Sequence, residues 1–243
     1  AITTLSGLKK AGPKEGLRAA LVDAVAQAQQ AGAVHAELRG RFFLGRSFED
    51  WGEFDGAQEW FSSAIDVATA AGLPWAPYGF ESRWQLALVE LIRGRWDEVL
   101  RLTSVVDQGP PPIPRALLLP VRLHVQQARG ADVMRELKPL RKLWSREGGI
   151  AVHTAALEMV QAGRDGDAAA VLAIYDDAVR VLGRIWHEWF SARIRLAAVA
   201  AGTIADLMPR MSAAERAAYA AHVDRLSDDG HTVAFSNDSS VLV

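Results

Sequence analysis

The chain has 243 residues, of which 50% are hydrophobic and 23% are charged, and its formal net charge is -2. This composition supplies ample apolar material for a core and gives no argument for global disorder. The near balance of charge argues against a dominant basic face, so we expect no direct nucleic-acid partner. The absence of cysteine excludes disulfides, thiolate metal ligands and cysteine nucleophiles.

The sequence contains no segment that predicts a membrane span or a secretory signal. Its most apolar runs, such as residues 196–201, fall far short of the roughly 20 residues that a span needs. The chain begins AITTLSGLKKAG, without an initiator Met and without a basic start followed by an apolar run. We therefore expect a segment of a longer protein, located in the cytoplasm and without a membrane partner.

The first helices are predicted around two helix-ending signals. Residues 1–10 are typical of the remains of a helix, and Gly12-Pro13 ends it. Residues 14–30 then carry an apolar stripe at helical spacing, and Gly32 follows as a stop signal. We interpret this second helix as the second half of an incomplete first repeat.

A helical hairpin is predicted over residues 37–71. Its small and apolar residues fall at helical spacing on two segments that Gly52 separates: Leu44, Gly45, Phe48, then Ala57, Phe61 and Ala64. The same kind of turn returns about 42 residues later at Gly94, again between two apolar helices. A repeated turn indicates a repeated unit, and hence a stack of units.

The rest of the chain is divided by prolines and glycines. A connector is predicted over residues 72–79, then a helix pair over 81–93 and 97–106, and then a stiff proline bridge over 109–114. The next pair, over 115–129 and 131–145, is expected to be kinked or shortened by Pro120 and Pro139. A pair over 150–162 and 167–182, a long helix over 186–208 and a last helix follow; the last helix starts at the capping box Ser212 to Glu215 and ends near Leu226. We expect one repeat domain over residues 1–227 and an extended or disordered tail over 228–243.

The hairpin residues resemble the tetratricopeptide motif, a helix-turn-helix repeat with small or apolar marked positions. In the first unit Arg41 departs from the usual Trp, and in the next unit Glu90 and Thr103 replace large apolar residues. The later units match only in outline. The resemblance implies an all-α fold, a right-handed solenoid of about five antiparallel hairpins.

A narrower resemblance starts at the phrase Ala70-Ala71-Gly72-Leu73-Pro74-Trp75, which an arginine-bearing helix and Gly94 to Leu100 follow. It is similar to the helical-repeat sensor region of large ATP-dependent LuxR-family, MalT-like transcriptional regulators. The resemblance implies a sensor or interaction segment that takes a peptide, protein or small-molecule effector, with flanking ATPase and DNA-binding modules as partners. The chain itself contains no phosphate-binding loop and no convincing recognition helix.

The same resemblance implies where a ligand would bind, because the first helix of each tetratricopeptide pair lines the concave groove. That placement selects Arg39, Phe42, Arg46, Glu81, Trp84 and Leu88. An aromatic ring flanked by arginines can clamp an extended peptide, stack on a planar ligand or hold a carboxylate. The alternative is that Arg39, Arg46 and Glu81 form exposed ion pairs between adjacent helices, each worth about 0 to 1 kcal/mol.

Residues with catalytic or metal-binding potential form no complete motif. His187-Glu188 is expected on a helix, but the second histidine of a zinc site is missing. Asp165-Gly166-Asp167 lacks the ligands of a calcium loop, and Asp167 is better explained as a helix N-cap. We therefore expect no catalytic residue, no cofactor and no metal. Two alternatives stay open: a scaffold that self-associates as a homodimer or larger assembly through tryptophan-rich edges, and a hydrolase-type enzyme that uses His187 and Glu188.

A basic stripe recurs at helical spacing in the third pair: Arg135, Lys138, Arg141, Lys142 and Arg146. Its apolar companions, among them Leu137, Leu140 and Trp144, are expected to face inward. The stripe could meet an acidic partner or a phosphate backbone. Since acidic residues dilute it and the whole chain is weakly acidic, we interpret it as a solvated outer face.

Overall fold

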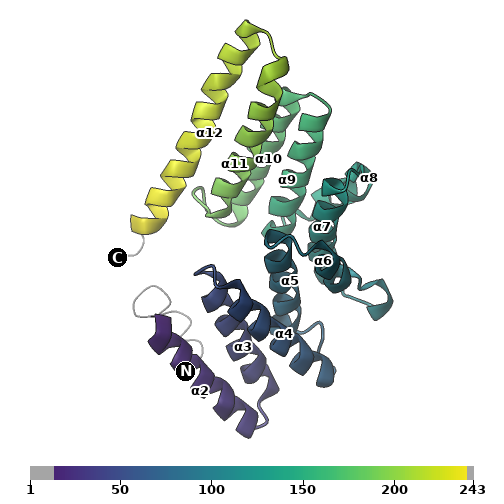
Figure 1. Cartoon of the computed structure of the whole chain (residues 1–243), viewed down its shortest axis with the longest axis vertical. Helices are drawn as coiled ribbons and strands as arrows, with labels where there is room; N and C mark the ends of the chain where they lie inside the picture. Colours follow the sequence, from purple (N-terminus) through teal and green to yellow (C-terminus); the bar gives the residue numbers. More distant parts are fainter. Residues whose placement is uncertain (1–13, 240–243) are drawn as a thin grey trace. The chain divides into compact units, whose positions relative to one another are not determined.

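The structure, a computed structural model, describes residues 14–239 (Figure 1). The helix expected over residues 1–10 lies outside the described residues. Within them all regular structure is helical, which confirms the all-α class. The chain divides into two compact units, residues 1–125 and 126–243. The expected repeat domain of residues 1–227 spans parts of both units.

The first unit is built from helices that closely follow the predicted ones. They are α2 (Lys14–Gln30), α3 (Val34–Glu49), α4 (Phe54–Ala70), α5 (Pro77–Ile92), α6 (Trp96–Thr103), the short 3-10 helix η2 (Val106–Gln108) and α7 (Pro112–Ala128), which extends past the unit boundary. Both α5 and α7 begin at a proline inside a segment that was expected to be irregular. Proline is compatible with the first helical turn, because the N–H that it lacks has no acceptor there.

One backbone motif ends most of these helices. The N–H of a glycine with positive φ donates to the carbonyl three residues earlier, and the next N–H donates to the carbonyl five residues before it. The two distances are 2.9 and 3.0 Å at Gly52, and 3.1 and 2.9 Å at Gly94. This is the Schellman motif, which needs the left-handed conformation that glycine adopts most easily. It recurs at Gly32, Gly72, Gly130 and Gly166. The prediction that the turns at Gly52 and Gly94 are equivalent is confirmed.

In the first hairpin, each of the two helices places a phenylalanine ring against a glycine of the other helix. A Cβ atom added to Gly45 of α3 would lie 2.4 Å from the ring of Phe61 of α4. A Cβ atom added to Gly56 of α4 would lie 2.3 Å from the ring of Phe48 of α3. Phe61 is fully buried, so these glycines set how closely α3 and α4 approach each other.

The second hairpin, α5 with α6, places a carboxylate where the first places an aromatic ring. Glu90 precedes Gly94 by the same four residues by which Phe48 precedes Gly52, and its side chain is 0% exposed. Neither carboxylate oxygen accepts a hydrogen bond within the described part of the chain, and Arg95 Nη1 lies 3.6 Å away. Burial raises the pKa of the Glu90 carboxyl above its ordinary value, and Arg95 and Arg93 oppose that shift. The charged form of Glu90 is therefore destabilising.

Replacing Glu90 with leucine is expected to raise the free energy of unfolding at neutral pH by about 1 to 2 kcal/mol, because a buried acceptor without a donor is removed. The folded state binds the Glu90 proton more tightly than the unfolded chain does. Wild-type stability should therefore fall as pH rises from the ordinary carboxyl pKa through the raised one, and this contribution should vanish in the variant. Urea unfolding at several pH values measures both effects, with Glu90→Gln as the matched variant that cannot ionise. A leucine variant no more stable than the wild type at neutral pH would contradict the assignment.

The second unit contains the C-terminal part of α7, α8 (Met134–Leu137), the 3-10 helix η3 (Lys138–Leu143), α9 (Gly148–Arg164), α10 (Ala168–Ile185), α11 (Ala192–Leu207), the 3-10 helix η4 (Met208–Arg210) and α12 (Ala213–Ser239). Pro139 shortens the helix expected over 131–145, as predicted, since it lies at the start of η3. The long helix expected from Trp186 begins only at Ala192. The reason is packing in the turn: Trp186 lies against the backbone of Gly148, and Phe190 is buried beneath it.

The centre of the second unit is α9, which is buried on nearly its whole circumference. It packs on α10, on α11 and on η3. The polar side chains of His153, Thr154 and Glu158 are buried with it. Despite its apolar surroundings, neither α9 nor any other helix in residues 14–239 has the length and hydropathy of a membrane-spanning helix.

The prediction of an extended tail over residues 228–243 is wrong for residues 228–239, because these residues continue α12. The sequence there has no helical period, but α12 packs along α11, and Leu226 and Val233 are buried seven residues apart on that face. Tertiary contacts thus outweigh weak local propensity. At the start of α12 the predicted capping box is confirmed, since Ser212 N donates to Glu215 (2.8 Å) and Glu215 N donates to Ser212 Oγ (3.3 Å).

Candidate binding surface

The six residues expected to line a groove lie on two neighbouring helices of the first unit. Three belong to α3 and three to α5: Arg39, Phe42, Arg46, Glu81, Trp84 and Leu88. Helix α3 packs on α5 as well as on its hairpin partner α4, so the two sets are brought together. We call the neighbouring surfaces of these helices the α3–α5 face.

The apolar members of the set are used mainly in packing. Phe42 is 9% exposed, and its ring centroid lies 6.0 Å from that of Phe61 and 5.6 Å from that of Tyr78. It belongs to the core and offers little surface to a ligand, which corrects the expectation for this residue. Trp84 and Leu88 are half-buried and pack against the same core, so each keeps part of its surface accessible.

Among the charged members, Arg46 is arranged differently from the ion pairs between helices that were the alternative. Arg46 pairs within its own helix region, with Glu49 at 2.7 Å and Asp50 at 3.2 Å. Such pairs three and four residues apart stabilise a helix by a few tenths of a kcal/mol. Glu81 is half-buried on α5. For Arg46 the expectation of pairing across helices is therefore wrong.

Arg39 has the most distinctive surroundings on the α3–α5 face. Its guanidinium carbon lies 5.7 Å from the ring centroid of Phe43 and 5.6 Å from that of Tyr78. Its Nε is buried and finds no acceptor among the residues that the structure describes. A guanidinium is attracted to the faces of aromatic rings, and its in-plane N–H groups match the geometry of a carboxylate. Sequence reasoning did not select Phe43 and Tyr78, although the Phe doublet in α3 was a signal for them.

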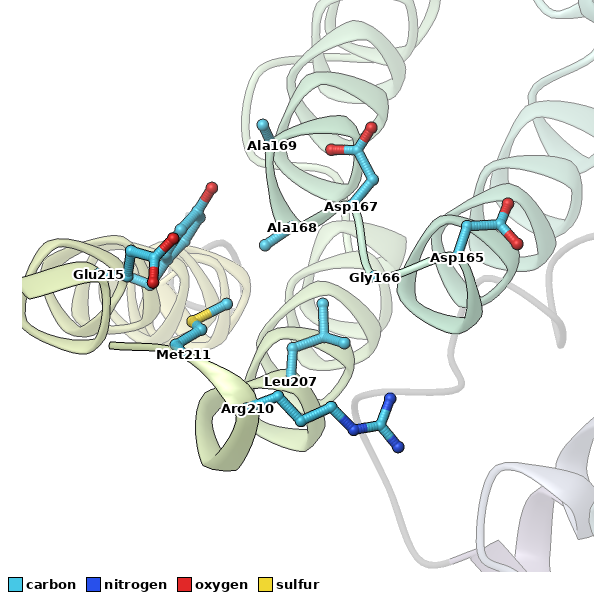
Figure 2. Close-up of a pocket in the computed structure, with 10 residues that line it drawn as sticks. Asp165, Gly166, Asp167, Ala168, Ala169, Leu207, Arg210, Met211 and Glu215 are labelled. Carbon is cyan, nitrogen blue, oxygen red and sulfur yellow. The ribbon is translucent and has the colours of Figure 1, made fainter. Parts of the chain in front are cut away.

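An acidic pocket of about 380 Å³ lies in the second unit between the α9–α10 turn and the start of α12. Figure 2 shows Glu215 on one side of it and Asp165 and Asp167 on the other. The carboxylates already serve local structure. Asp167 Oδ1 accepts from the N–H of Ala170 at 2.8 Å, which confirms the predicted N-cap, and Glu215 forms the capping box. We therefore interpret this pocket as a space between helix ends whose carboxylates cap those ends.

His187 and Glu188 lie in the turn between α10 and α11, not on a helix as expected. Both residues are exposed, and the Glu188 carbonyl accepts a hydrogen bond from Arg193 Nη1 at 3.1 Å. In the described ranges no group of three His, Asp or Glu side chains could hold a metal ion.

A polar network that the sequence did not reveal joins the last three long helices. The Tyr175 hydroxyl of α10 donates to Asp229 Oδ2 of α12 at 2.7 Å, and Arg193 Nη2 of α11 lies 2.8 Å from Asp229 Oδ1. Burial, helped by the bond to Asp229, raises the pKa of the Tyr175 hydroxyl, which stays protonated. The network fixes α12 against its neighbours and has a structural role.

No protein-family model, curated protein or solved structure matches the chain. The similarity to tetratricopeptide repeats and to MalT-like sensor segments, and the alternative of a self-associating scaffold, stay predictions from the sequence. Among the predicted surfaces, the α3–α5 face combines a half-buried arginine, Arg39, whose guanidinium makes no ion pair within the described residues, with half-buried apolar side chains.

Proposed function

We propose that the chain is a non-catalytic binding module made of helical hairpins, and that the α3–α5 face carries its ligand site. The observation that supports this most is the environment of Arg39, a half-buried cation beside two adjoining aromatic rings, whose guanidinium makes no hydrogen bond or ion pair in the described part of the chain. Preorganised donors of this kind bind carboxylates with little loss of side-chain entropy. The half-buried Trp84 on the adjacent helix adds an apolar contact.

The proposed architecture is a right-handed solenoid of about five tetratricopeptide-like hairpins. In support, α3 and α5, the first helices of consecutive pairs, pack on each other, whereas among the described helices no comparable packing joins the second helices α4 and α6. The second unit shows the same order, since α9 packs on α10 and on α11. In a stack where only first helices meet, those helices lie on the concave side. That is the side on which the α3–α5 face would lie.

In this proposal the chain is the sensor or interaction segment of a multidomain transcriptional regulator or signalling ATPase of the LuxR-family, MalT-like kind, and would act in the cytoplasm. The effector is a peptide, protein or small molecule that presents a carboxylate to Arg39. Its binding would favour one arrangement of the hairpins over others and so change their contacts with flanking modules. A ligand shifts such an equilibrium only by its difference in affinity for the two arrangements.

The test is a screen of metabolites, sugars and acidic peptides by thermal unfolding, because a ligand of the folded state raises the melting temperature. We expect a saturable carboxylate ligand whose affinity falls about tenfold in Arg39→Gln, the loss of one charge-assisted hydrogen bond. Arg46→Gln is the matched control: it removes an arginine of the same helix that is already paired with Glu49 and Asp50, and it should change affinity less than about twofold. Equal affinities of wild type and Arg39→Gln would refute the assignment of the site.

A further inference from the structure

A second pocket, of about 290 Å³, lies in the first unit between the end of α6, the connector that follows it, and α7. It is lined by Thr103, Ser104, Val105, Pro110, Arg115, Leu118, Leu119 and Arg122. The four residues from α7 have the spacing i, i+3, i+4 and i+7, which puts them on one helix face. Two leucines thus lie between two arginines along the pocket wall.

The guanidinium groups of the two arginines have no acidic partner within the described part of the chain. Within residues 14–239 neither the Arg115 nor the Arg122 guanidinium makes a hydrogen bond or an ion pair, and the pocket lining contains no acidic side chain. Other arginines of the same unit are paired: Arg93 lies 2.6 Å from Asp55, and Arg18 lies 2.9 Å from Glu53. Side chains two helical turns apart are about 10 Å apart along the axis, and both arginines are long enough to reach a common anion between them.

The other polar groups of the pocket add one available donor. Thr103 Oγ1 donates to the carbonyl of Val99 at 2.7 Å, so its proton is already used. The Ser104 hydroxyl is exposed and makes no hydrogen bond among the described residues. The end of α6 and the start of α7 contribute helix-dipole charges of opposite sign, each about half a unit, so the two guanidinium groups decide the sign of the pocket.

We propose that this pocket binds a small organic oxyanion with a short apolar group. Arg115 and Arg122 hold the anionic oxygens, with Ser104 as an additional donor, and the apolar group packs on the half-buried Leu119 and Pro110. The volume lies at the lower limit of small-molecule sites, which restricts the ligand to a few carbon atoms beyond the charged group. This site is independent of the α3–α5 face and goes beyond the proposed function.

The experiment is calorimetric titration of the whole chain with hexanoate, with hexanamide as the uncharged probe and acetate as the probe that lacks the apolar group. Hexanoate is expected to bind with a Kd of about 1 mM, and more weakly as the salt concentration increases. The double variant Arg115→Gln/Arg122→Gln should weaken hexanoate binding at least about tenfold, by the worth of one charge-assisted hydrogen bond or more. Hexanamide and acetate should each bind more weakly than hexanoate does.

A control variant distinguishes binding in this pocket from a general attraction of anions to arginine. Arg146→Gln removes an exposed arginine of the basic stripe and should leave hexanoate binding unchanged. The single variants Arg115→Gln and Arg122→Gln, with helix content checked by circular dichroism, should each give an intermediate loss. The proposal is overturned if hexanoate shows no saturable binding up to roughly 10 mM, if hexanamide binds equally well, or if Arg146→Gln weakens binding as much as the double variant does.

Discussion

Replacing Arg141 with methionine is expected to lower the free energy of unfolding by about 3 kcal/mol, the lower end of the cost of leaving a buried charge without its partner. Arg141 donates from Nε and Nη2 to Glu158 Oε2, at 2.9 and 2.5 Å, and the Glu158 side chain is 2% exposed at the centre of the second unit. The bond to Glu158 also raises the pKa of Arg141. We expect a cost at the lower end of that range because Arg141 itself is 41% exposed. Water can therefore enter the space that the guanidinium leaves and solvate the Glu158 carboxylate.

Urea unfolding measures this loss, and Arg180→Met is the matched control. Arg180 pairs with Asp177 on the surface of α10, and both side chains are partly exposed, so its removal should cost within about 0.5 kcal/mol. In the double variant Arg141→Met/Glu158→Gln the buried charge is gone, and part of the lost stability should return. The expectation fails if Arg141→Met is no more destabilising than Arg180→Met.

Replacing Gly45 with alanine is expected to lower the free energy of unfolding by about 3 kcal/mol, at the upper end of the usual cost of overpacking. The new Cβ would lie 2.4 Å from Cε1 of Phe61, whose ring is fully buried and rests against Phe42. The ring cannot move outward without opening the first hairpin. This cost exceeds the gain of up to about 1 kcal/mol that alanine brings over glycine within a helix.

Gly202→Ala tests whether the effect of Gly45→Ala comes from packing. Gly202 lies within α11, and a Cβ added there would meet no atom within 4 Å. Only the helix-propensity gain of about 0.5 to 1 kcal/mol should appear, so the variant should be more stable than the wild type. Thermal unfolding of both variants gives the comparison. If Gly45→Ala proves as stable as the wild type, the close contact with Phe61 does not set the helix separation.

The parts of the fold that could be predicted from sequence are those fixed by a few neighbouring residues. The turns at Gly52 and Gly94, the N-cap at Asp167 and the capping box at Ser212 depend on local hydrogen bonds, and they are confirmed. The course of α12 depends on burial against α11 over a stretch that includes Asp229, and no local pattern reveals such contacts. The basic stripe also contains a contact that no local pattern reveals, because Arg141 donates to a carboxylate that lies 17 residues away in the sequence.

The candidate site was predictable to a similar extent. Repeat spacing placed Arg39 and Trp84 on adjacent helices, which the packing of α3 on α5 supports. It could not show that Phe42 turns into the core or that Phe43 and Tyr78 lie beside Arg39, since these depend on how far each helix is rotated. The arginine pair of α7 is hard to predict for a different reason. Prolines dominate the sequence pattern there, and a shallow wall of leucines between two arginines has no motif of its own.

The Schellman motif at successive glycines has a consequence for how such a chain could change its length. Each helix end is closed by hydrogen bonds within about six residues, so its geometry does not depend on which helix comes next. Duplication or deletion of a segment between two of these glycines would connect existing turns to existing helices and would not require a new type of turn. Such a change would leave the local hydrogen bonds of every remaining turn in place.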